Sequence, residues 1–205
     1  MATVRPLRHR SETEDPALHA RAMDNLAFIR DTMESAGAFT AVSGWGLVFV
    51  GLTAVVAAVL AAQQTTAQGW IQIWLGAALL APLIQIWAVV RKVRAARIPL
   101  LRGPGRKFLL SFLPPMLVGA LLTIVFYRAG LIELLPAIWL LLYGAAIVAG
   151  GAFSVQIVPF LGASFMVAGA VALFAPPEWS NWIMGATFGG LHIAFGIPIA
   201  RRHGG

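Results

Sequence analysis

The sequence predicts an all-α membrane protein, a polytopic bundle of six transmembrane helices preceded by a cytoplasmic amphipathic helix. Three observations lead to this prediction. Of the 205 residues, 59% are hydrophobic and only 11% are charged, whereas soluble domains carry roughly 25% charged residues. Six apolar stretches are long enough to cross a bilayer, and the cations flank them. We therefore expect lipid to surround most of the chain.

The first forty residues are the most polar part of the chain. Residues 1–16 hold a basic and an acidic cluster without any apolar period, which predicts a disordered cytoplasmic tail. In residues 17–40, apolar side chains recur at helical spacing and charged side chains fill the other face. This pattern predicts an amphipathic helix that lies along the cytoplasmic membrane surface or against the loops there.

Residues 41–200 form the predicted transmembrane domain. A span needs about 20 apolar residues, with a range of about 17–25, and six stretches reach that length. Prolines inside them, such as Pro82 and the pair Pro114-Pro115, are expected to kink or end helices. The stretches are 41–62, 70–90, 108–127, 134–153, 158–174 and 182–200.

The placement of the cations predicts the orientation. The loop at residues 91–107 holds seven cations and no acid, and short loops rich in Lys and Arg stay in the cytoplasm. With both termini inside, only Arg128 of the 15 Lys and Arg residues would face outward. We therefore expect a multi-pass protein of the bacterial cytoplasmic (inner) membrane, with residues 201–205 as a cytoplasmic tail. Cations beside apolar runs also argue against nucleic-acid binding, despite the net charge of +7.

Two further features bear on this topology. The connection between the fourth and fifth stretches is short and uncharged, and if these stretches formed one interrupted element the C-terminus would lie outside. Tryptophans gather near the predicted outer ends, as in an interfacial aromatic belt. They are Trp70, Trp74, Trp139, Trp179 and Trp182.

An internal repeat is suggested when the chain is aligned with itself at an offset of 68 residues. Gly51 then meets Gly119, and Gly76 meets Gly144. A third unit fits with a shorter outer loop, which predicts three tandem hairpins related by an axis along the membrane normal. The alternative is chance coincidence among segments dominated by small apolar residues.

Three tandem hairpins with small residues in mid-helix, in a six-span chain of this size, resemble the bacterial acid-resistance membrane proteins of the HdeD type. The resemblance covers residues 41–200 as a pattern and rests on no specific motif. It implies a six-span bacterial membrane protein, and it carries over no functional residue.

The candidate intramembrane polar site consists of His192, Gln72, Gln85 and Thr187. His192 lies in the middle of the sixth stretch, where an ionisable group is costly and is often functional. It would bind a ligand, relay a proton or ligate a metal, or it would be a neutral histidine that hydrogen-bonds to a neighbouring helix. No second histidine lies in a span and the chain has no cysteine, so we predict neither a metal nor a cofactor.

Small residues recur at helical spacing in several of the apolar stretches. Gly185 and Gly189 form a Gly-x-x-x-Gly step, and Gly144 and Gly162 lie on further small-residue faces, which predicts close helix packing. The chain has no phosphate-binding Gly-rich loop, His-Glu-x-x-His motif or Gly-x-Ser-x-Gly motif. We therefore predict that it is not an enzyme.

Three functional hypotheses follow. The first is a membrane component that acts through contacts with lipid, with a second copy or with another membrane protein, in an envelope or stress-related role. The second is a channel or facilitator for a small neutral or weakly charged solute, and the third is an intramembrane module that binds an apolar ligand. A continuous polar cavity that reached His192 would favour the facilitator, and a dry core of small residues would favour the contact role.

Overall fold

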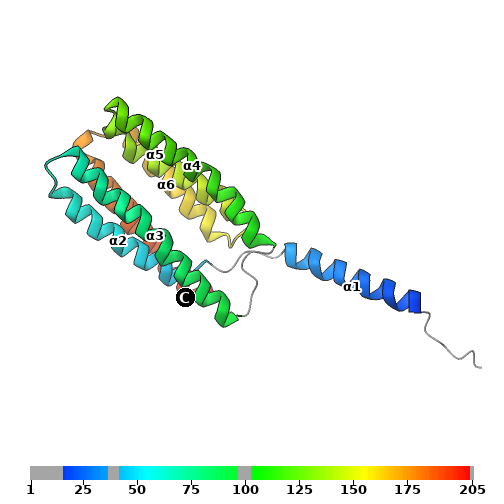
Figure 1. Cartoon of the computed structure of the whole chain (residues 1–205). Helices are drawn as coiled ribbons and strands as arrows, with labels where there is room; N and C mark the ends of the chain where they lie inside the picture. The colour runs from blue at the N-terminus through cyan, green and yellow to red at the C-terminus, as the bar shows by residue number, and fades with distance from the viewer. Residues whose placement is uncertain (1–15, 37–41, 97–102, 204–205) are drawn as a thin grey trace, which may run out of the picture. The chain divides into compact units, whose positions relative to one another are not determined.

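The computed structural model describes residues 16–36, 42–96 and 103–203. The chain forms two units, Met1–Gly37 and Ala38–Gly205 (Figure 1). The first unit contains the helix α1 (Pro16–Ala36), which covers most of the predicted amphipathic segment. Its apolar side chains Met23, Leu26 and Ile29 are exposed. Of the predicted tail, residues 1–15 lie outside the described residues, and Pro16 is the first residue of α1.

The second unit contains six helical spans that are long and apolar enough to cross a membrane. The predicted all-α, six-span bundle is thereby confirmed for the described part of the chain. One-turn 3-10 helices, η1 (Ile132–Leu134) and η2 (Pro177–Trp179), form the first turns of the fourth and sixth spans. The first five spans are α2 (Gly44–Ala62), α3 (Ala67–Ala96), α4 (Pro104–Ala129), α5 (Leu135–Gly151) and α6 (Ile157–Phe174). The last span joins α7 (Ser180–Met184), the π-helix η3 (Gly185–Leu191) and α8 (His192–His203).

The cationic loop predicted at residues 91–107 is shorter than expected. Helix α3 continues to Ala96 and α4 begins at Pro104, while residues 97–102 lie outside the described part. The 30 residues of α3 correspond to about 45 Å of helix, longer than the roughly 30 Å of hydrocarbon. Its cationic end therefore projects beyond the predicted membrane core.

The internal prolines do not end their helices. Helix α3 runs through Pro82, and α4 runs through Pro114 and Pro115. Transmembrane helices tolerate prolines because neighbouring helices and local adjustments satisfy the backbone carbonyls that they free. Pro104, by contrast, stands at the start of α4, where a missing N–H costs nothing.

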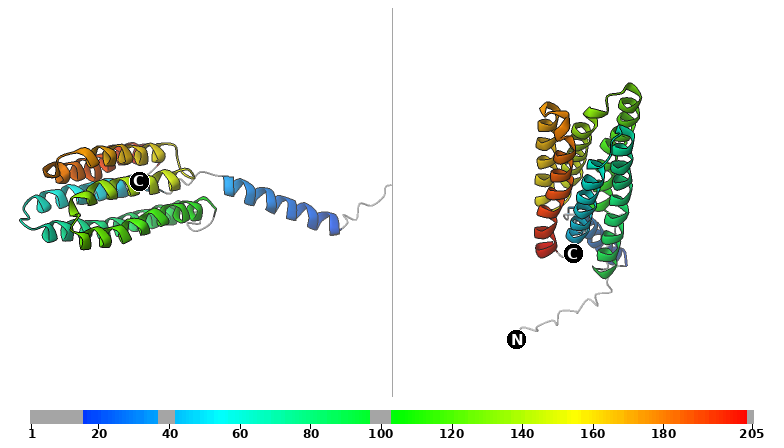
Figure 2. Two further views of the ribbon diagram at one scale, coloured as in Figure 1. Left: turned by 90° about the horizontal axis from the view of Figure 1, so that it is seen from above. Right: turned by 90° about the vertical axis from the view of Figure 1, so that its left-hand side faces the viewer.

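The six spans form two sets of three. Helix α2 packs between α3 and the last span, and α5 packs between α4 and α6. We call α2, α3 and the last span the first helix group, and α4, α5 and α6 the second helix group. Figure 1 shows α4, α5 and α6 together on one side of the bundle and α2 and α3 on the other, and Figure 2 shows that all six spans run side by side.

The fourth and fifth predicted spans are separate and antiparallel. A methyl group at Gly151 would lie 3.1 Å from Pro159, one at Gly144 would lie 2.7 Å from the Gly162 carbonyl oxygen, and one at Gly169 would lie 2.8 Å from Leu141. As the α6 partner advances along the chain, the α5 partner retreats. The alternative of a single interrupted element is therefore wrong.

The two ends of the six-span region lie at the same end of the bundle. A methyl group at Gly44, in the first turn of α2, would overlap the backbone of Ala200 near the end of α8. Nearby, the Lys92 ammonium at the cationic end of α3 donates a hydrogen bond to the Val42 carbonyl at 3.0 Å. This geometry agrees with an even number of spans.

The predicted internal repeat stays a prediction. Its equivalent glycines have unlike surroundings, because Gly76 has open space where a methyl group would stand, whereas Gly144 lies against α6. The two halves of the third hairpin also have their main partners elsewhere, since α6 packs on α5 and the last span packs on α2.

Candidate functional site

The mid-depth histidine is joined to the second helix group by a hydrogen bond. The hydroxyl oxygen of Tyr143 on α5 lies 2.7 Å from Nε2 of His192, and Nδ1 of His192 lies 2.7 Å from the Phe188 carbonyl oxygen. A carbonyl can only accept, so Nδ1 carries the proton and Nε2 accepts from the tyrosine. Both nitrogens of a neutral imidazole thus form hydrogen bonds. This geometry agrees with the alternative in which His192 is a neutral histidine that hydrogen-bonds to a neighbouring helix.

Aromatic rings enclose this pair. The His192 side chain is 1% exposed, and the Phe165 side chain beside it is fully buried. Phe165 meets the imidazole edge-on at a centroid distance of 5.1 Å, and Phe188 stacks on it at 6.1 Å. Edge-to-face and offset-stacked rings stabilise one another and leave little space for water. The centre of the bundle is therefore a packed aromatic core.

The π-helix η3 immediately precedes His192, and the sequence reading did not predict it. Its wider turn occupies Gly185–Leu191, a segment with three glycines. Methyl groups at Gly185 and Gly189 would lie within 2.8 Å of side chains on α2, namely Ala58 and Val55. Such π segments are rare and often occur at functional sites. Here the segment supplies the Phe188 carbonyl that binds His192.

Asn181 is a second polar centre that the sequence reading missed. Its Oδ1 accepts hydrogen bonds of 3.2 Å from the indole N–H groups of both Trp70 and Trp74, and its Nδ2 donates to the Ala58 carbonyl at 2.8 Å. One amide therefore ties α7 to both α2 and α3. The available signal was a lone asparagine between two tryptophans at the start of a predicted span.

The predicted tryptophan belt is only partly a belt. Trp179 and Trp182 are exposed, but Trp70 stacks on Trp139 of the second helix group at 6.0 Å with nearly parallel rings. The Trp139 indole donates to Thr123 at 2.8 Å. Because protein acceptors satisfy these N–H groups, the inward tryptophans can leave the interface and pack between the helix groups.

The structure does not bring the four candidate polar residues together. Gln72 is exposed on α3, and Gln85 lies on the same helix about 20 Å further along. The Gln85 side-chain oxygen is buried near Gly46 without a hydrogen-bond partner in the described part of the chain. Thr187 is buried on η3, in the same span as His192.

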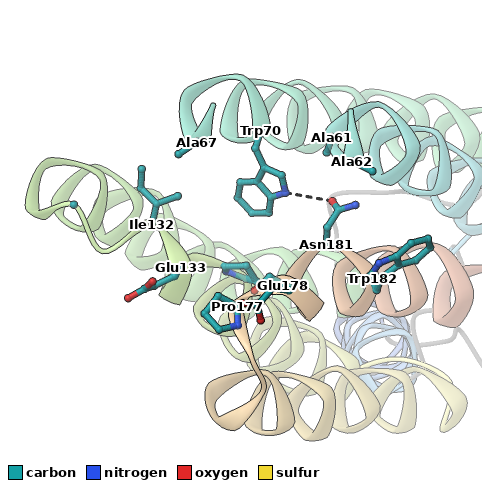
Figure 3. Close-up of a pocket in the computed structure, with 13 residues that line it drawn as sticks. Ala61, Ala62, Ala67, Trp70, Ile132, Glu133, Pro177, Glu178, Asn181 and Trp182 are labelled. Atoms are coloured by element: carbon teal, nitrogen blue, oxygen red, sulfur yellow. Dashed lines mark hydrogen bonds between the residues drawn. The ribbon is translucent and has the colours of Figure 1, made fainter. Parts of the chain in front are cut away.

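A pocket of about 560 Å³ lies at the end of the bundle where the spans are predicted to face outward. Three connections build it: α2 to α3, α4 to α5, and α6 to α7. It includes none of the four predicted polar residues. Figure 3 shows Ala61, Ala62 and Ala67 along one edge, Glu133, Pro177 and Glu178 along the opposite edge, and the Trp70 indole between them. The other lining residues are Gly130, Ile132, Pro136, Ser180, Asn181 and Trp182.

Neither a metal-binding cluster among the described residues nor a similar protein indicates what the site binds. Among the residues that the structure describes, no three His, Cys, Asp or Glu side chains are placed to hold a metal ion. No protein-family model, curated protein or solved structure matches this chain.

Proposed function

We propose that this multi-pass protein is a non-enzymatic component of the bacterial cytoplasmic membrane that acts through contacts with lipid or with membrane protein, including a second copy of itself. Both ends of the chain face the cytoplasm, and its role belongs to the envelope or to a stress response. The observation that carries the proposal is the hydrogen bonding of His192. Both of its ring nitrogens are hydrogen-bonded inside a packed aromatic core, which leaves neither nitrogen free to contact a solute.

The outer faces of α3 and α4 are the surfaces that this proposal assigns to contacts. Of the 18 most apolar consecutive residues in each of these helices, only 11% are buried within the bundle, whereas 39% are buried in α2 and in the fourth span. Leu79 and Leu83 on α3 and Leu121 on α4 are each at least 64% exposed. Leucine-rich faces of this kind suit hydrocarbon or a neighbouring transmembrane helix.

A solute facilitator is the second candidate, and one observation favours it. The end pocket lies between the two helix groups and extends to Trp70, which stacks on Trp139 across the boundary between them. Motion of one group against the other would extend the pocket toward Tyr143 and His192. The same helix-group boundary would then be a pathway rather than a packed contact.

A flux assay separates the two candidates. Proteoliposomes with the wild-type chain, the variant His192→Ala, or no protein would be mixed with hyperosmotic glycerol or urea, and swelling would be followed by light scattering. The contact role predicts that wild-type and empty liposomes swell at the same rate. Wild-type swelling clearly faster than that of empty liposomes, and altered by His192→Ala, would overturn it in favour of the facilitator.

A further inference from the structure

The end pocket has the size of a small-molecule site. Its volume of about 560 Å³ falls within the roughly 300–1,000 Å³ that ligand pockets span. It lies at the ends of the helices, at the depth where lipid headgroups and dissolved molecules both have access. The pocket can therefore take a compact polar group from either source.

Its charge is opposite to that of the rest of the bundle. The unit Ala38–Gly205 contains ten Lys and Arg residues but only two acids, Glu133 and Glu178. Both acids line this pocket, and no Lys, Arg or His does. Neither carboxylate forms an ion pair or a hydrogen bond with the described residues. Two connections 45 residues apart in the chain thus contribute both acidic side chains of the unit to one pocket.

One aromatic side chain of the lining, Trp70, is held in place before any ligand arrives. The Trp70 indole is fixed by its hydrogen bond to Asn181 and by its stacking on Trp139. Trp182 lines the pocket from α7. Indole faces attract ammonium groups through the ring quadrupole, and carboxylates attract them by charge. Aromatic rings combined with carboxylates are the usual means of recognising quaternary ammonium ligands.

We infer that the end pocket binds an ammonium group, carried either by the headgroup of a zwitterionic lipid or by a free organic cation. The carboxylates of Glu133 and Glu178 supply the opposite charge, and Trp70 and Trp182 supply aromatic contact. This site goes beyond the contact role proposed above and does not depend on it.

The first test uses a free ligand and a neutral analogue of the same shape. The full chain would be placed in phosphatidylglycerol nanodiscs, whose headgroups lack an ammonium group, and titrated by calorimetry with choline and with 3,3-dimethyl-1-butanol. We expect choline to bind at least about tenfold more tightly than the neutral alcohol, because only choline gains from the carboxylates. The double variant Glu133→Gln/Glu178→Gln should lose about tenfold in choline affinity. Asp24→Asn, which removes one charge from α1, should not change it.

The second test asks whether the ligand is a lipid. The wild type and the double variant would be equilibrated with an equal mixture of phosphatidylcholine and phosphatidylglycerol, and the retained lipids would be identified by native mass spectrometry. Retention of phosphatidylcholine by the wild type and its loss in the double variant identify the headgroup as the source. Choline binding without lipid selection identifies a free cation. The inference would be overturned if the wild type showed no preference for phosphatidylcholine and, in the first test, either choline bound no more tightly than the alcohol or the double variant bound choline as tightly as the wild type. Gel filtration checks that the variants fold, which is expected because both glutamates are exposed.

Discussion

At the scale of single residues, the hydrogen bond between Tyr143 and His192 decides how the centre of the bundle is interpreted. The two side chains come from different helix groups, and their atoms are 2.7 Å apart. Phe165 and Phe188 cover the pair. A buried imidazole with both nitrogens satisfied stabilises one arrangement of helices, whereas an unsatisfied one would be costly.

Replacing Tyr143 by Phe should therefore destabilise the bundle. The change removes the donor to His192 Nε2 and keeps the ring, so we expect a loss of about 1 kcal/mol in the free energy of unfolding. Thermal unfolding in detergent micelles would measure it. The matched control is Tyr127→Phe at the only other tyrosine, which is 43% exposed and should have no measurable effect.

A double-mutant cycle checks that the loss comes from this pair. His192→Phe removes the polar group that Tyr143→Phe would leave without a donor. The double variant should therefore lose less stability than the sum of the two single variants. Strict additivity would mean that the two side chains do not interact in the membrane-embedded protein.

The sequence allowed His192 to be predicted as a mid-depth polar residue, with a hydrogen bond to a neighbouring helix as one of its two roles. It did not allow Tyr143 to be predicted as the partner, because the choice depends on which faces of distant helices meet. Gln72 shows the same limit. It looks like an intramembrane polar group from its position in the chain, yet its side chain is exposed on α3.

At the scale of elements, glycines set the closest helix contacts. Gly144 and Gly162 face each other between α5 and α6, and Gly51 faces Gly189 between α2 and η3. Hydrocarbon solvates leucine as well as a helix does, so close van der Waals contact is what remains to hold such helices together. The small-residue faces predicted from the sequence were confirmed at these positions. Which helices they join depended on tertiary packing that spacing along the chain does not encode.

The substitution Gly144→Ala should destabilise the second helix group. The added methyl group would lie 2.7 Å from the Gly162 carbonyl oxygen, and overpacking of this kind costs about 1–3 kcal/mol. Gly76→Ala is the control, since its methyl group would meet open space and helix propensity alone would favour it by about 1 kcal/mol. Unfolding of the two variants should thus shift in opposite directions. A stabilised Gly144→Ala variant would contradict this packing.

At the scale of the whole molecule, the sequence predicted the six spans because long apolar runs and flanking cations are local signals. The division into two helix groups could not be predicted, since α2 pairs with a span more than 120 residues later in the chain. The end pocket was missed for the same reason. Glu133 and Glu178 are unremarkable in their own loops, and they become a feature only when folding places both in one pocket.

Labelling of single cysteines tests the central claim, that a closed six-span bundle crosses the membrane with both ends on the cytoplasmic side. The chain has no cysteine of its own, so each introduced thiol reports one position. In intact cells, an impermeant maleimide should label Thr65→Cys between α2 and α3 and should leave Gln156→Cys and Arg202→Cys unlabelled until the cells are permeabilised. Ala146→Cys, in the fully buried part of α5, should resist labelling in both conditions. Labelling of Arg202→Cys from outside, or of Ala146→Cys in either condition, would contradict the account.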